Sequence, residues 1–127
     1  MKTSDSAVDY VIRHFEKRGI RLVKAKRGDV GFDLKTAKED LFIEVKGSTK
    51  ERINFRYFEN SEYEKARTCR RNDIPYEVHI VSGIGTKKRK HYCIPGDVLI
   101  QDARPEIKWS LRMRKSMNEF LVDSNPQ

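Results

Sequence analysis

Two acidic residues and a lysine have the types and spacing of a metal-dependent catalytic site: Asp33, Glu44 and Lys46. Glu44 and Lys46 alternate with Ile43 and Val45 in a short apolar segment. Alternate side chains of a strand share a face, so the carboxylate and the ammonium project from the same side. Placing such charges beside apolar neighbours is unfavourable unless they pair or bind a metal.

The turn that follows Asp33 decides whether this residue joins the other two. Closure by Lys38 and Glu39 alone, or by the four residues 37–40, gives the same register, with Asp33 opposite Glu44. Directly opposed residues share a face, with Cβ atoms about 5 Å apart. Two carboxylates at that distance repel, and a divalent cation such as Mg²⁺, which prefers oxygen ligands, relieves the repulsion. An odd-numbered turn would put Asp33 on the other face.

Such a site can hydrolyse phosphodiester bonds. The cation would polarise a phosphate oxygen and lower the pKa of a bound water. Lys46 would stabilise charge on the phosphate in the transition state or orient the attacking water. The alternative is a surface hairpin in which Glu44 and Lys46 form an ordinary ion pair of small energetic value.

The elements that position these residues follow from apolar periodicity and turn signals. Helices are predicted from about residue 5 to Gly19 and, capped by Asn60 or Ser61, to about Arg71. Strands are predicted at 20–25, 30–35, 41–46, 52–57, 76–81, 91–94 and 107–114, with a frayed tail from Ser124. This order predicts an α/β fold, a mixed central sheet flanked by helices with extra C-terminal strands. No linker interrupts it, so one domain is expected over residues 1–127.

The chain carries a net charge of +8, with an isoelectric point near 9.6. A basic domain attracts polyanions, nucleic acid first and an anionic membrane surface second. A basic run beside two glycines and two arginines of the last predicted strand are candidates for phosphate contacts. These candidates are Lys87, Lys88, Arg89, Lys90, Arg112 and Arg114. For each of them, a plain solvated surface is the alternative.

The remaining reactive side chains form no pattern in the sequence. Cys69 and Cys93 are far apart, so neither a disulfide framework nor a zinc site is predicted. His14, His79 and His91 have no informative spacing. No signal peptide and no apolar run of about 20 residues is present, which predicts a cytoplasmic protein without membrane contact.

The pattern Asp33-x₁₀-Glu44-x-Lys46 resembles the PD-(D/E)XK nuclease superfamily, which includes type II restriction enzymes and archaeal Holliday junction resolvases. The stretch FIEVKGS, followed by NSEYEKA, is also similar to the nuclease-like domain at the C-terminus of NO VEIN. The resemblance covers roughly residues 5–82. It implies a restriction endonuclease-like core in the order α-β-β-β-α-β, dependence on Mg²⁺ or Mn²⁺, and cleavage of DNA.

The resemblance also implies roles for particular residues. Asp33, Glu44 and the backbone carbonyl of Val45 are expected to bind the metal, and Lys46 to act as the catalytic cation. Asp9 is the nearest match to a metal-binding glutamate in the first helix of many resolvases. Small members of the superfamily often act as homodimers, so a homodimer on DNA is expected. Two alternatives stay open: a catalytically idle module that binds nucleic acid or a protein partner, and a basic adaptor for an acidic protein.

Overall fold

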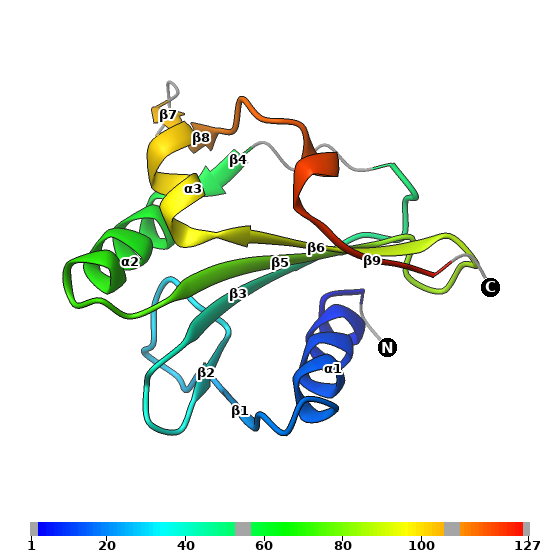
Figure 1. Cartoon of the computed structure of the whole chain (residues 1–127), viewed down its shortest axis with the longest axis horizontal. Helices are drawn as coiled ribbons and strands as arrows, with labels where there is room; N and C mark the ends of the chain where they lie inside the picture. Colours follow the sequence, from blue (N-terminus) through cyan, green and yellow to red (C-terminus); the bar gives the residue numbers. More distant parts are fainter. Residues whose placement is uncertain (1–2, 53–56, 106–109, 126–127) are drawn as a thin grey trace.

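The computed structural model describes residues 3–52, 57–105 and 110–125, and Figure 1 shows the arrangement of the elements. The elements are α1 (Thr3–Glu16), β1 (Leu22–Lys24), β2 (Leu34–Thr36), β3 (Phe42–Gly47), β4 (Tyr57–Glu59), α2 (Asn60–Arg71), β5 (Tyr76–Ser82), β6 (Arg89–Pro95), α3 (Gly96–Asp102), β7 (Arg104–Pro105), β8 (Ser110–Arg112), the 3₁₀ helix η1 (Met117–Phe120) and β9 (Leu121–Asn125).

Within the described residues, six strands form the central sheet, in the order β1-β2-β3-β5-β6-β9. The pair β3–β5 is parallel, and the other neighbouring pairs are antiparallel. A parallel pair needs a crossover connection, and α2 lies in the one between β3 and β5. The predicted α/β class with a mixed sheet between helices is confirmed.

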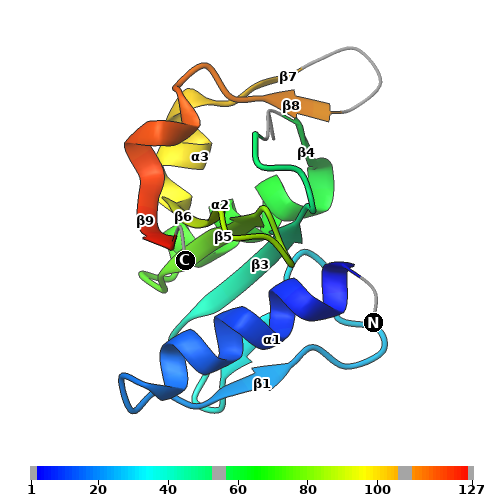
Figure 2. The same cartoon turned by 90° about the vertical axis from the view of Figure 1, so that its right-hand side faces the viewer.

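The side chains of β3 divide the core into two layers. Ile43 and Val45 pack in one buried cluster with Val11 of α1. Phe42 packs in the other cluster with Ala66 of α2. Figures 1 and 2 show α1 on one side of the sheet and α2 and α3 on the other. The even-numbered side chains of β3, Glu44 among them, therefore face the α2 side.

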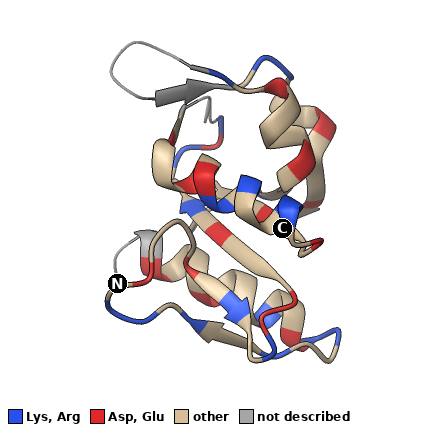
Figure 3. Ribbon diagram, turned by 90° about the vertical axis from the view of Figure 1, so that its left-hand side faces the viewer, with Lys and Arg blue, Asp and Glu red and all other residues tan. Residues whose placement is uncertain are grey.

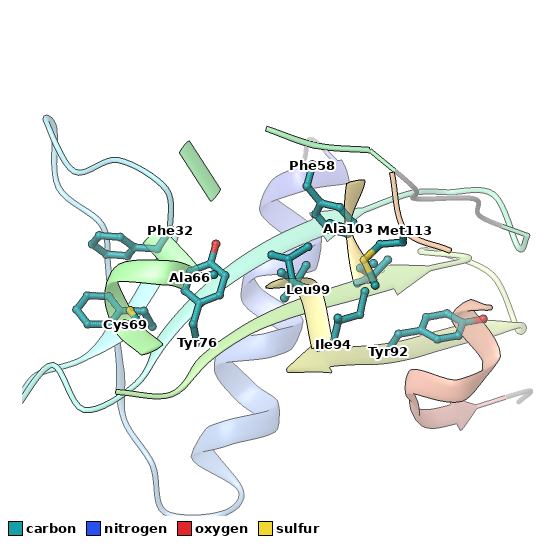
Figure 4. Close-up of a cluster of buried hydrophobic side chains, with 13 residues drawn as sticks. Phe32, Phe58, Ala66, Cys69, Tyr76, Tyr92, Ile94, Leu99, Ala103 and Met113 are labelled. Atoms are coloured by element: carbon teal, nitrogen blue, oxygen red, sulfur yellow. The ribbon is translucent and has the colours of Figure 1, made fainter. Parts of the chain in front are cut away.

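A smaller sheet covers part of the α2 side of the molecule. In the described part of the chain its order is β4-β8-β7. Phe58 of β4, Leu99 of α3 and Met113 after β8 are fully buried together (Figure 4). This packing fixes the segment before α2, and with it the start of that helix.

Two predicted N-terminal strands are shorter in the structure. The strand expected at 30–35 begins only at Leu34, because Val30 is 65% exposed and Gly31 has a φ of +85° that turns the chain. The strand expected at 20–25 is limited to Leu22–Lys24.

The C-terminal part departs further from the prediction. The strand expected at 52–57 falls largely on residues outside the described ones, and β4 follows it. Pro95, taken as a strand stop, also precedes α3, since its φ of −62° suits a helix start. Of the strand expected at 107–114, residues 110–112 form β8, whereas Met113 and Arg114 lie outside the strand. The tail expected from Ser124 instead continues the strand β9, whose last two residues are Ser124 and Asn125 and which pairs with β6.

The turn at Gly31 packs closely against α2, and substitution of this glycine tests how much that contact contributes to stability. A Cβ at this position would lie 2.5 Å from the carbonyl oxygen of Ser61 and 2.7 Å from Cβ of Lys65, both in α2. We expect Gly31→Ala to lower the free energy of unfolding by roughly 2–4 kcal/mol, from backbone strain plus this overlap. Urea denaturation measures the loss.

The matched control for this substitution is Gly28→Ala. Gly28 also has a positive φ, +96°, but a Cβ there meets nothing within 4 Å. Only the backbone strain remains, about 1 kcal/mol. Equal losses in the two variants would show that the contact between the Gly31 turn and α2 does not matter.

Candidate functional site

The β2–β3 hairpin has the predicted register. Leu34 pairs with Ile43 across the hairpin, and the next step of this register places Asp33 opposite Glu44. The N–H of Thr36 donates to the carbonyl of Leu41 at 3.1 Å and closes the turn, so the four residues 37–40, an even number, lie between the paired residues, as the site requires.

Asp33 is half-buried immediately before β2 and is held by the backbone of β3. Its N–H donates to the carbonyl of Ile43 at 2.8 Å, and its Oδ2 accepts from the N–H of Val45 at 2.8 Å. Both bonds fix the carboxylate beside Glu44. With Oδ2 engaged in this way, Oδ1 is the oxygen best placed to serve a ligand.

Glu44 and Lys46 lie together on the α2 side, as predicted, but they share this place with Glu62 of α2. The Nζ of Lys46 is 3.1 Å from Oε2 of Glu62 and 3.9 Å from Oε2 of Glu44. The three side chains are only 6–16% exposed. We call Asp33, Glu44, Lys46 and Glu62 the carboxylate–lysine cluster.

The cluster contains more negative than positive groups. The pKa of Glu44 is raised to about 10, first by burial and then by the negative charges of Glu62 and Asp33 and a hydrogen bond with Glu62, while Lys46 opposes the shift. Without a cation, Glu44 therefore keeps a proton at neutral pH. Mg²⁺ and Mn²⁺ suit oxygen donors, and either ion can replace this proton. The donor set thus fits the expected metal.

Glu62 is the site residue that the sequence prediction missed. Its Oε1 accepts from the N–H of Glu59 at 3.1 Å, so the start of α2 positions this carboxylate. Negative charge is also favourable near a helix N-terminus. A signal was available: Glu62, Ala66 and Cys69 have the i, i+4, i+7 spacing of one helix face, and all three are buried. The helix cap was also misplaced, since Glu59 and not Asn60 or Ser61 is the N-cap.

The raised pKa of Glu44 predicts how metal-free stability depends on pH. The folded state keeps a proton between the ordinary pKa of 4.5 and about 10, whereas the unfolded state releases it. Stability therefore falls as pH rises through this window. We expect metal-free Glu44→Gln to exceed the wild type by roughly 2–3 kcal/mol near pH 8 and to match it near pH 4.

Urea denaturation in the presence of a chelator measures this difference. The control is Glu64→Gln, because Glu64 is an exposed residue of α2 that pairs with Arg67. A Glu44→Gln variant that is less stable than the wild type near pH 8 would contradict the assignment of surplus negative charge to the cluster.

Val45 and Asp9 are the other two residues that were expected to bind the metal. Val45 lies between Glu44 and Lys46, and its N–H is the donor to Asp33. Asp9 lies on α1, which covers the other side of the sheet, and its Oδ1 is 4.0 Å from Nζ of Lys24. Asp9 is therefore not among the side chains that the structure brings together.

The basic run lies at the end of the sheet toward which β3 and β5 point. Lys87 and Lys88 are exposed in the turn before β6, and Arg89 and Lys90 begin that strand. The Nζ of Lys88 is 3.7 Å from Glu51, and the guanidinium of Arg89 lies 4.4 Å from the ring centroid of Tyr10.

The two C-terminal arginines lie in the smaller sheet or directly after it, since Arg112 ends β8. Arg114 binds Asp102, with 3.6 Å between Nε and Oδ1, and the side chain of Arg112 lies outside the described residues. Figure 3 shows Lys and Arg interspersed with Asp and Glu over the visible face. Positive charge is thus spread over the surface and is not confined to one element.

Comparison with known proteins gives one family. The family model described as Protein NO VEIN, C-terminal matches residues 4–94. This segment includes the whole carboxylate–lysine cluster and reaches into β6. A search of curated proteins finds no match. Among the described residues, no helix has both the length and the apolarity to cross a bilayer.

Proposed function

This chain belongs to the NO VEIN C-terminal family, and from that premise and the geometry of its carboxylate–lysine cluster we propose that it is a metal-dependent nuclease that hydrolyses DNA. The observation that supports this most strongly is the surplus of carboxylates around Lys46. Asp33, Glu44 and Glu62 converge from a loop, a strand and a helix, and among the described residues Lys46 is the cation that pairs with the two glutamates. Burying three carboxylates so close together that one glutamate keeps a proton lowers the stability of the fold. Binding of a divalent cation would explain why the chain has this arrangement.

Each residue of the cluster has a distinct task in this proposal. Asp33 and Glu44 hold the metal, and the bond from Val45 N–H keeps Asp33 in place. When bound, Mg²⁺ or Mn²⁺ would polarise a phosphate oxygen and lower the pKa of a bound water. Lys46 offers its ammonium to the charge that develops on the phosphate. Glu62 positions Lys46 through their 3.1 Å contact.

DNA is the proposed substrate because the chain is basic and the site chemistry suits phosphodiesters. The net charge of +8 favours a polyanion over a small acidic substrate. The exposed Lys87 and Lys88, with Lys90 beside them, lie beyond the end of β5 and can contact backbone phosphates away from the site. Such contacts give affinity that decreases as salt increases.

The test is nicking of supercoiled plasmid by the purified protein with Mg²⁺ or Mn²⁺. We expect cleavage that a chelator stops and that Asp33→Asn loses, because asparagine removes the charge that binds the cation but keeps the side-chain shape. Gel-shift titration of the same variant should give DNA affinity close to that of the wild type, since the basic surface is intact.

The outcome that contradicts the proposal is specific. A wild-type protein that binds DNA but never nicks it with either metal would indicate a binding module. Cleavage that persists unchanged in Asp33→Asn would indicate a contaminating nuclease, and the activity would then not belong to this chain.

A further inference from the structure

A second group of ligating side chains lies on the α1 side of the sheet, opposite the carboxylate–lysine cluster. Glu77 and His79 belong to β5, and Cys93 of β6 is the direct cross-strand partner of His79. One ligand atom from each of the three, a carboxylate oxygen, an imidazole nitrogen and the sulfur, lie within 4.8 Å of one another. We call these residues the Glu77–His79–Cys93 cluster.

The imidazole of His79 is oriented as a metal ligand would be. Its Nε2 faces Glu77, 2.8 Å from Oε1, and its Nδ1 lies 2.7 Å from Nε2 of His91. A proton on Nδ1, donated to His91, leaves the lone pair of Nε2 directed toward the cluster. Metal-binding histidines commonly hold their second nitrogen through such a partner.

His91 is itself held firmly enough to act as that partner. It is fully buried, and its ring makes edge contacts with those of Tyr10 and His14, at centroid distances of 5.2 and 4.7 Å. Its Nδ1 has no hydrogen-bond partner in the part of the chain that the structure describes. The side chain is therefore committed to a single polar contact, the one with His79.

We propose that Glu77, His79 and Cys93 bind a Zn²⁺ ion. The combination of sulfur, imidazole nitrogen and one carboxylate selects zinc over Mg²⁺ or Ca²⁺, which take oxygen ligands. Binding releases the thiol proton of Cys93 to solvent. The zinc ion replaces the proton that Nε2 of His79 donates to Glu77 in the metal-free protein, and the neutral imidazole then carries its one proton on Nδ1, donated to His91. Three protein ligands leave the fourth position to water, and partial exposure of Glu77 and Cys93 makes that position accessible.

This site is separate from the proposed nuclease site and differs from it in metal preference. The zinc ion would join β5 to β6 beneath the end of α1, where the ring of Phe15 packs 5.3 Å from that of His79. The hydrogen bond from His79 lowers the pKa of Glu77, and the charge of Arg18 adds to this effect, although Arg18 also repels a cation. The affinity then depends on the three ligands and on the His91 contact.

Cobalt titration of the reduced, metal-free full-length protein tests the proposal, because Co²⁺ replaces Zn²⁺ and reports a thiolate ligand by a near-ultraviolet charge-transfer band. We expect this band, which reports only the thiolate site, to reach saturation as Co²⁺ is added and to be lost when Zn²⁺ is added. Cys93→Ser should abolish the band. His79→Gln should weaken Zn²⁺ binding by about tenfold or more.

Two controls separate this site from the rest of the molecule. Cys69→Ala removes the other thiol, which belongs to α2 and is buried in the core on the opposite side of the sheet, and should keep the band. Glu44→Gln alters the carboxylate–lysine cluster and should keep it as well. A wild type without the band, or a band that survives Cys93→Ser, would overturn the proposal.

A measurement on the wild type covers the case in which Cys93→Ser fails to fold. Zn²⁺ should slow alkylation of Cys93 by iodoacetamide, followed by peptide mass spectrometry, whereas Mg²⁺ should not. Equal rates with and without Zn²⁺ would overturn the proposal independently of any variant.

Discussion

Replacing Glu44 with glutamine is expected to lower Mg²⁺-dependent DNA cleavage by about a thousandfold. Glutamine keeps the length of the side chain and can still donate a hydrogen bond to Glu62. It removes the charge that lets the cluster exchange a proton for a cation, so several kcal/mol of transition-state stabilisation are lost. Single-turnover rates with saturating protein measure the effect on the chemical step.

The same substitution should raise the stability of the metal-free protein while it lowers the cleavage rate. These opposite effects distinguish a ligand-binding residue from a purely structural one. A residue that serves only the fold loses stability when it is changed, whereas a residue that destabilises the fold for the sake of a ligand gains it. The control is Glu64→Gln, an exposed change on α2 that should alter neither property. Undiminished cleavage in Glu44→Gln would remove Glu44 from the reaction.

Lys46→Gln is expected to reduce cleavage by about a hundredfold or more, the usual effect of removing one group that stabilises transition-state charge. The Nζ of Lys46 is held between Glu44 and Glu62 on the α2 side and lies 5.5 Å from the ring centroid of Phe58. It is thus a fixed cation in a largely buried place. Single-turnover cleavage measured alongside gel-shift affinity separates a catalytic loss from a binding loss.

The matched control is Lys65→Gln. Lys65 is a neighbouring lysine whose Nζ lies 4.0 Å from the ring centroid of Phe42, outside the cluster. Its replacement removes the same charge from the chain and should leave cleavage near the wild-type rate. Equal losses in the two variants would mean that Lys46 acts only through net charge and DNA affinity.

The core of the site could be predicted because it depends on local rules. Alternation along β3 puts Glu44 and Lys46 on one face, and an even-numbered turn brings Asp33 opposite Glu44. Both rules concern a single hairpin of adjacent residues. The helix of residues 60–71 was predicted for a similar reason, a clear apolar period bounded by turn signals.

The missed features depend on contacts between distant segments. Glu62 reaches Lys46 only because α2 crosses over between the parallel strands β3 and β5. Cys93 meets His79 only through the register of β5 and β6. β9, whose last two residues were predicted to belong to a frayed tail, forms because the edge of β6 provides its hydrogen-bond partners. None of these contacts can be inferred from the spacing of the residues along the sequence.

The most direct test of the account is a crystal soaked in Mn²⁺ and measured near the manganese absorption edge. We expect an anomalous peak between the carboxylates of Asp33 and Glu44, on the α2 side of the sheet, and no such peak in Glu44→Gln crystals. A fully soaked wild-type crystal with no peak between these carboxylates, and with Lys46 still bound to Glu62 as in the metal-free protein, would contradict it.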